Sequence, residues 1–137
     1  MSRKPCDDNG ILDAMPKTVL VADDNEMVRR EICRLLIRET EIEVCEEARD
    51  GLDAIHKAQE LNPHLIILDL SMPIMNGVDA ARVLRTRMPA IPIIMFTSHD
   101  DPLLQQELLS VGITAVVSKS DSSALTQKAR TLLQNAA

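Results

Sequence analysis

The feature that most constrains the fold of this chain is an alternation of short apolar runs with longer amphipathic segments. Five apolar runs follow one another: TVLVA (18–22), IEVCE (42–46), HLIIL (64–68), IPIIMF (91–96) and ITAVV (113–117). Short runs so rich in β-branched and aliphatic residues are typical of strands buried on both faces of a parallel sheet. The second run is more polar, so we place it at an edge of the sheet.

The segment after the first run has apolar residues at helical spacing and arginines on its other faces. Its inward-facing residues are predicted to be Val28, Ile32, Leu35 and Leu36. The arginines predicted to face elsewhere are Arg29, Arg30, Arg34 and Arg38. Asn25 is a candidate N-cap for this helix.

Four further helices are predicted, of which the first begins near Asp50 or Gly51 and has Leu52, Ile55 and Ala58 inward. The other three are expected over residues 78–87, 102–109 and 122–134, and Gly112 is placed to stop the second of them. Strands that alternate with helices indicate a doubly wound α/β domain with a five-stranded parallel sheet and five helices. Residues 1–16 show no periodicity and are expected to form a flexible leader before a domain at 17–137.

Charge and cysteine content narrow the class of protein. The net charge of −6 argues against nucleic-acid binding by this chain itself. The N-terminus lacks the apolar run of a signal peptide, and no stretch reaches the roughly 20 apolar residues of a membrane span, so we expect a cytoplasmic protein with no membrane partner. The odd cysteine count and the spacing of Cys6, Cys33 and Cys45 imply neither a disulfide framework nor a zinc site.

Polar residues follow four of the apolar runs directly. Asp23 and Asp24 follow the first, Asp69 the third, Thr97 and Ser98 the fourth, and Ser118 and Lys119 the fifth. In open parallel α/β sheets, ligands bind outside the carboxyl ends of the strands. We therefore expect three carboxylates, a hydroxyl group and an ammonium group to gather at one rim of the sheet.

This set of groups suits one chemistry. Crowded carboxylates repel one another unless a cation shares their site, and Mg²⁺ binds carboxylates, backbone oxygens and water. A carboxylate such as that of Asp69 can attack phosphorus to give an aspartyl phosphate. Mg²⁺ and Lys119 would neutralise the phosphoryl oxygens, and Thr97 would donate a hydrogen bond to one of them. Each residue alone could be a helix cap or a solvated charge; their co-occurrence at different strand ends favours the functional interpretation.

The segments VLVADDNEMVRR, LIILDLSMPIMNG, IIMFTS and VVSKS, in this order, resemble the receiver domain of bacterial two-component response regulators. The resemblance covers residues 17–134 and implies a flavodoxin-like strand order 2-1-3-4-5. By position, Asp69 corresponds to the phosphoacceptor, Thr97 to the switch hydroxyl and Lys119 to its partner. Asp24, Asp69 and the backbone carbonyl of Ser71 correspond to the Mg²⁺ ligands, with Asp23 acting through metal-bound water.

The resemblance also implies how the domain works and with what. A sensor histidine kinase or phosphotransfer protein would supply the phosphoryl group, and the response would appear on the fourth and fifth helices and the last strand. A downstream protein target, or a fused effector domain outside this chain, would receive the signal, and the same two helices could form a homodimer. The domain would catalyse only its own modification, so we expect no turnover enzyme.

Five positions carry expectations of their own. Val116 stands where the family often has an aromatic switch residue, and Ser120 stands where a cis proline often follows the lysine, so a trans Lys119–Ser120 bond is predicted. Gly77 is expected to adopt positive φ in the loop after Asp69, which Pro73 would stiffen. His99, two residues after Thr97, is either an exposed loop residue or an influence on the phosphoryl lifetime.

Three other functions stay open. An aspartate-nucleophile phosphatase usually has a second Asp two residues after the first, but Ser71 occupies that position. A dinucleotide-binding enzyme would need a G-x-G-x-x-G turn after the first strand, where this chain has ADDNEM. A receiver-like interaction module that is never phosphorylated is the third alternative.

Overall fold

The computed structural model describes residues 16–98 and 101–135, in which five parallel strands form one sheet in the order β2-β1-β3-β4-β5. The strands are β1 (Thr18–Ala22), β2 (Val44–Ala48), β3 (Leu65–Leu68), β4 (Ile93–Thr97) and β5 (Ala115–Ser118). The predicted parallel sheet and strand order are confirmed. β2 lies at an edge as predicted, but it begins at Val44, two residues after the start of the predicted run, and Val44 pairs with the first residue of β1.

Within the described residues, four helices connect the strands and a fifth follows β5. Each helix is preceded by an N-cap residue whose side chain accepts a backbone hydrogen bond. The helices are α1 (Glu26–Glu39), α2 (Gly51–Leu61), α3 (Gly77–Arg87), α4 (Pro102–Val111) and α5 (Ser122–Gln134). Their caps are Asn25, Asp50, Asn76, Asp101 and Asp121. Gly112 ends α4 with a φ of 109°, as its position in the sequence predicts.

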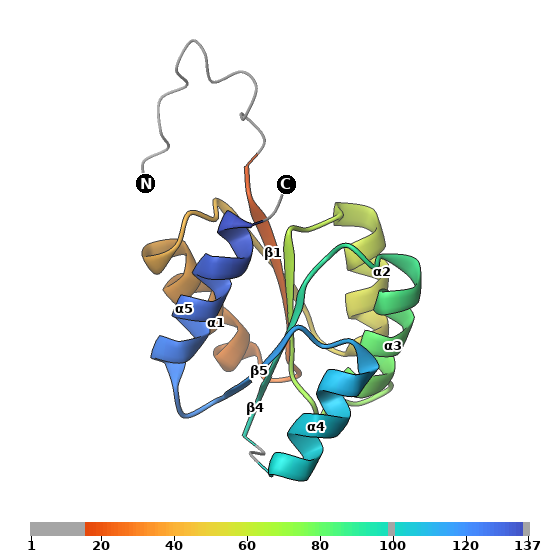
Figure 1. Ribbon diagram of the computed structural model, residues 1–137. Coiled ribbons are helices and arrows are strands. Elements are labelled where there is room, and N and C mark those ends of the chain that lie inside the picture. The colour runs from red at the N-terminus through yellow and green to blue at the C-terminus, as the bar shows by residue number, and fades with distance from the viewer. Residues whose placement is uncertain (1–15, 99–100, 136–137) are drawn as a thin grey trace.

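The helices cover both faces of the sheet (Figure 1). α1 and α5 pack on one face, and α2, α3 and α4 pack on the other. Side chains of a strand alternate between the two faces, so that Leu20 belongs to the core under α2 and α3 while Val21 belongs to the core under α1 and α5. Strands buried on both faces explain why the apolar runs are nearly continuous.

Two predicted helix faces are wrong in detail. Leu52 is exposed on α2, because the buried side of this helix consists of Gly51, Ala54, Ile55 and Ala58 at the i, i+3, i+4, i+7 positions. Arg29 on α1 is half-buried against β2, whereas the other three arginines of this helix are exposed.

The prediction that the cysteines form no disulfide is also wrong. Cys33 on α1 and Cys45 on β2 are joined by a disulfide, with their Cα atoms 5.6 Å apart. Cys33 lies on the sheet-facing side of α1, and the chain reverses between α1 and β2, which brings the two residues together. Cysteine spacing along the sequence carries no information on this approach.

The predicted leader at 1–16 lies almost wholly outside the described residues and stays a prediction. Within residues 16–98 and 101–135, none of the helices is long and apolar enough to cross a membrane.

Candidate functional site

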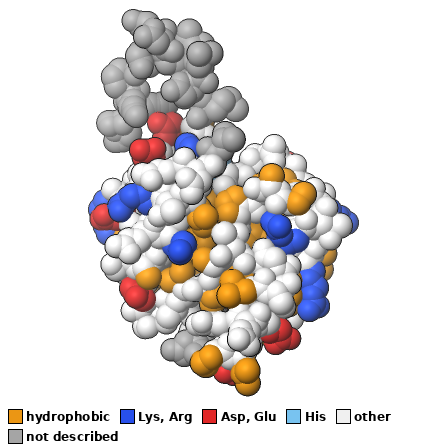
Figure 2. All heavy atoms as spheres, viewed as in Figure 1, with side chains coloured by type: hydrophobic (Ala, Val, Ile, Leu, Met, Phe, Trp, Pro, Cys, Tyr) orange, Lys and Arg blue, Asp and Glu red, His pale blue; other side chains and the backbone are white. Residues whose placement is uncertain are grey.

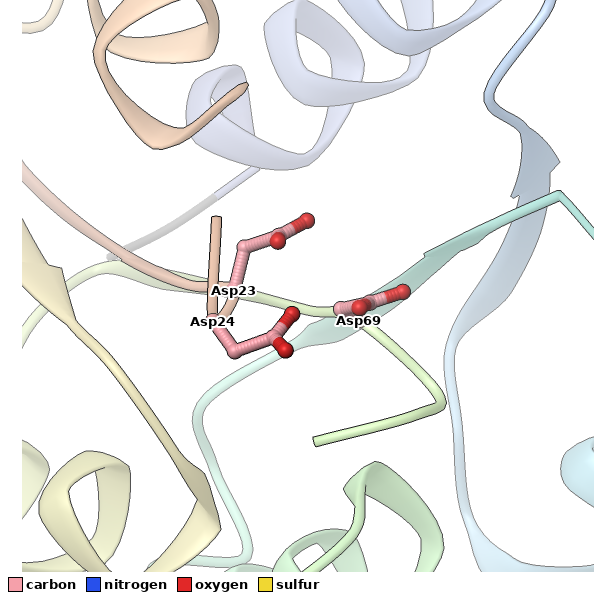
Figure 3. Close-up of side chains that lie close together, drawn as sticks. All are labelled: Asp23, Asp24 and Asp69. Atoms are coloured by element: carbon pink, nitrogen blue, oxygen red, sulfur yellow. The ribbon is translucent and has the colours of Figure 1, made fainter. Parts of the chain in front are cut away.

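Three aspartates lie at the carboxyl ends of two adjacent strands (Figure 3). Asp23 and Asp24 follow β1, and Asp69 follows β3. Backbone hydrogen bonds continue beyond the strands: the Asp23 amide donates to Ala48 O at 3.0 Å, and the Asp69 amide donates to Ala22 O at 2.9 Å. The sheet therefore fixes the backbone of both residues.

The three side chains form one cluster of oxygen atoms. One carboxylate oxygen from each of Asp23, Asp24 and Asp69 lies within 4.8 Å of the others. Asp23 and Asp69 are buried, with 2% and 8% of their surface exposed, whereas Asp24 is exposed. A cluster of carboxylates that is open on one side suits a hard divalent cation, which prefers oxygen ligands and keeps several waters.

Lys119, the residue after β5, bridges two of these carboxylates. Its Nζ atom lies 2.9 Å from Asp23 Oδ2 and 3.1 Å from Asp69 Oδ1. Burial by itself lowers the pKa of the Lys119 ammonium, but its hydrogen bonds and ion pairs with Asp23 and Asp69 reverse this, and the pKa is raised. Lys119 therefore stays charged inside the site.

Asp69 has the opposite balance. Burial, followed by the negative charge of Asp23, raises the pKa of the Asp69 carboxyl, and Lys119 only partly offsets this increase. The ionised Asp69 carboxylate is thus held in surroundings that disfavour its charge, so binding of a further cation would stabilise it.

The remaining site residues from the sequence occupy the same rim. Thr97 is the last residue of β4 and is buried, and its carbonyl accepts a hydrogen bond from the Lys119 amide at 2.8 Å. Ser71 is exposed two residues after Asp69, and the assignment of its carbonyl as a metal ligand stays a prediction. Ser98 is exposed.

The loop between β3 and α3 corrects the expectation for Gly77. Positive φ occurs at Ile74 (68°) and not at Gly77, which is the first residue of α3. A Cβ atom at position 77 would overlap the carbonyl oxygen of Asp69, and one at Gly51 would overlap that of Met75. Gly77 is therefore needed for close approach to the Asp69 backbone and not for its φ.

The other singled-out residues have simpler roles. The described residues contain no cis peptide bond, so Lys119–Ser120 is trans as predicted. Val116 is partly buried and packs against the core under α3 and α4. His64 accepts a hydrogen bond from the Thr18 amide at 3.1 Å, whereas His99 lies outside the described residues.

One residue beside the site was assigned to the wrong face. Arg29 donates from Nη1 to the Asp23 carbonyl at 2.8 Å and from Nε to Glu47 Oε1 at 2.9 Å. Helical spacing could have indicated the side of α1 on which Arg29 lies, because Ile32, predicted to face inward, is three residues further on. It could not have indicated the contacts with Glu47 and Asp23.

The sequence and the fold have counterparts among known proteins. The sequence model described as "Response regulator receiver domain" matches residues 19–130 of this chain. The chain belongs to the response regulator receiver family. As a receiver domain, it is part of a two-component signalling system, and its five-stranded flavodoxin-like sheet is the fold of that family.

Individual proteins similar to this receiver domain are also response regulators or domains of them. The response regulator protein VraR of Staphylococcus saprophyticus is 39% identical over 108 residues, which cover 79% of this chain and 52% of VraR. A LuxR-family two-component response regulator from an Aurantimonas species superposes with a TM-score of 0.81 at 28% identity, over 88% of this chain and 86% of that one. The response regulator domain of Thermotoga maritima CheB gives a TM-score of 0.79 at 26% identity, over 88% and 98% of the two chains. The chain spans about half the length of the first curated relatives that it matches.

Proposed function

We propose that Asp69 accepts a phosphoryl group from the phosphohistidine of a sensor histidine kinase or phosphotransfer protein. A carboxylate oxygen of Asp69 forms the new bond to phosphorus, and the phosphorus–nitrogen bond to the histidine breaks, so that the electron pair stays on the imidazole. The observation that carries the proposal is the position of Asp69, between the acidic pair after β1 and the ammonium group of Lys119.

Mg²⁺ is the cation proposed for the carboxylate cluster. Asp24, Asp69 and the backbone carbonyl of Ser71 would bind it directly, and Asp23 would do so through water. The fit rests on the donor set, since all these ligands are oxygens and Asp24 is open to solvent. When bound, Mg²⁺ neutralises charge on the transferring phosphoryl group.

Lys119 and Thr97 would hold the phosphorylated state. The Lys119 ammonium already lies 3.1 Å from Asp69 Oδ1 and would pair with a phosphoryl oxygen added there. The Thr97 hydroxyl would donate a hydrogen bond to another oxygen. Since all of these groups act on Asp69 of their own chain, the domain is a phosphoacceptor and catalyses only its own phosphorylation and dephosphorylation.

The output surface is proposed at the β5 edge, between α4 and α5. Figure 2, in the view of Figure 1, shows hydrophobic side chains at the surface around this open edge, with lysine and arginine beside them. A shift of Thr97 and Lys119 at the ends of β4 and β5 would reach this surface directly. A downstream protein, a second copy in a homodimer, or a fused effector domain would bind there.

Because the chain spans only about half of its curated relatives, the fused effector belongs to the proposal. A relative from Staphylococcus aureus is described as a DNA-binding response regulator of the LuxR family, which supports an effector domain that binds DNA. In this proposal the protein is cytoplasmic, and any DNA contacts come from such a domain and not from this one.

Intact-mass measurement tests the proposal. With Mg²⁺ and acetyl phosphate, or with a cognate kinase and ATP, the protein should gain one phosphoryl mass, and Asp69→Asn should gain none. Asp79→Asn, an exposed aspartate at the start of α3, is the matched control and should be modified normally. Absence of the gain with the cognate kinase would favour a receiver-like module that is never phosphorylated.

A further inference from the structure

The Arg29 side chain is partly buried and forms hydrogen bonds that have no role in the proposed phosphotransfer. It is the one half-buried arginine of α1, with 13% of its side chain exposed, against 59% for its neighbour Arg30. Its Nη1 donates to the Asp23 carbonyl and its Nε to Glu47 on β2. Guanidinium is suited to this task because its donors point in fixed directions within one plane.

The position of the Asp23 carbonyl affects the geometry of the acidic site. It belongs to the peptide unit that joins Asp23 to Asp24, and that unit is planar. Fixing its oxygen therefore restricts the direction in which the Asp24 side chain leaves the backbone. Asp24 is the exposed carboxylate of the cluster, and no hydrogen bond from another described residue holds its side chain.

The edge strand β2 holds the same peptide segment from both sides. The Ala48 carbonyl accepts a hydrogen bond from the Asp23 amide at 3.0 Å. Glu47 orients the Arg29 guanidinium group, which donates a hydrogen bond to the Asp23 carbonyl. Asp23 Oδ1 in turn accepts the Asn25 amide at 2.9 Å, which ties the segment to the first turn of α1.

We propose that Arg29 is a positioning residue for the acidic site, acting with Glu47 to fix the Asp23–Asp24 peptide and so the geometry that binds the divalent cation. This inference rests on the proposed function, because it assigns a role around the same site. Partners that orient metal ligands without touching the metal are worth about 10- to 100-fold in metal affinity.

Calorimetric titration with Mg²⁺ tests the inference without any phosphorylation. Arg29→Met should weaken Mg²⁺ binding about tenfold. Arg29→Lys keeps the charge but has a single donor atom, so it should give an intermediate loss. Arg30→Met removes the same charge from an exposed pair with Glu26 and should stay within about twofold of the unchanged protein.

A stability-matched variant separates positioning from general loosening. Ile32→Val removes one buried methylene from the same helix and leaves the Arg29 contacts in place. It should lower the melting temperature but not the Mg²⁺ affinity. Phosphorylation of Arg29→Met by acetyl phosphate should be slow at low Mg²⁺ and recover at saturating Mg²⁺, because the reacting groups are unchanged.

Glu47→Ala completes the test. If Glu47 acts through Arg29, the double variant Arg29→Met/Glu47→Ala should bind Mg²⁺ no more weakly than Arg29→Met. Additive losses would overturn the shared role. Equal Mg²⁺ affinity in Arg29→Met and the unchanged protein, or an equal loss in Ile32→Val, would overturn the inference while phosphorylation at Asp69 still held. Failure of the unchanged protein both to bind Mg²⁺ and to accept a phosphoryl group would instead overturn the proposed function, and the inference with it.

Discussion

The ammonium group of Lys119 lies 3.1 Å from one carboxylate oxygen of Asp69 and 2.9 Å from one of Asp23. One cation thus serves two buried anions, while a third carboxylate, Asp24, adds to the same cluster. The site therefore contains more negative than positive charge in the absence of a bound cation.

Asp69→Asn should stabilise the metal-free protein at neutral pH. The pKa of Asp69 is raised in the folded protein from its ordinary 3.8, first by burial. A group with a raised pKa favours the folded state at low pH, and this contribution is lost as pH rises through the folded pKa. Asparagine does not ionise, so its advantage should appear as pH rises above 3.8 and level off above the folded pKa. Urea unfolding at a series of pH values measures it.

Lys119→Met provides the control for this pH dependence. Lys119 lowers the pKa of Asp69, so its removal should raise that pKa further. In the Lys119→Met background, the advantage of Asp69→Asn should therefore develop over a window that extends to higher pH. An advantage that does not change between low and neutral pH would contradict the assignment of the charge imbalance to Asp69.

Gly77→Ala should destabilise the protein and disturb the site together. A Cβ atom at position 77 would overlap the Asp69 carbonyl oxygen, which belongs to the backbone and has little room to shift. We expect a loss of about 1–3 kcal/mol in the free energy of unfolding, as for other overpacked positions. Chemical denaturation measures this loss. Arg82→Ala, an exposed change on the same helix, should stay within about 0.5 kcal/mol.

Ile74→Gly should stabilise the protein. Ile74 has a φ of 68°, and the Met75 amide donates to the Pro73 carbonyl across it, which makes a strained γ-turn. Its side chain is 78% exposed, so little packing is lost with it. Relief of the strain should add about 1 kcal/mol to the free energy of unfolding, measured by urea denaturation.

The same substitution at a second exposed isoleucine is the control, because it should change the free energy of unfolding in the opposite direction. Ile37 lies inside α1 and is 50% exposed, so Ile37→Gly should destabilise by about 1 kcal/mol. Loss of stability in both glycine variants would show that the γ-turn at Ile74 stores no strain.

Reduction of the Cys33–Cys45 disulfide should destabilise the protein. The bond closes a loop across a sequence separation of 12, and opening a loop of that size costs about 3 kcal/mol through the entropy of the unfolded chain. Urea unfolding with and without a dithiol reductant measures the change, and the Cys33→Ser/Cys45→Ser variant should not respond. If all three cysteines can be alkylated in the folded protein before reduction, the bond is absent in solution.

Much of the fold and of the site was predictable from the sequence. The apolar runs indicated five buried strands, and the residues directly after them indicated which side chains meet. This works because the carboxyl ends of parallel strands lie at the same edge of a sheet, so Asp23, Asp24, Asp69 and Lys119 are brought together by connectivity alone. Asn25 and Gly112 were equally readable, since caps depend on local geometry.

Other features depend on distances between segments and on side-chain directions, which only the tertiary structure decides. The contact of Arg29 with Glu47 and Asp23, and the bond between Cys33 and Cys45, arise because α1 lies against β2. The positive φ fell on Ile74 and not on Gly77, and Gly77 is needed instead for the close approach of α3 to the Asp69 carbonyl. The sequence by itself thus determined which groups share the acidic rim, and tertiary packing decided what holds them in place, since close approach between distant segments leaves no periodic signal in the chain.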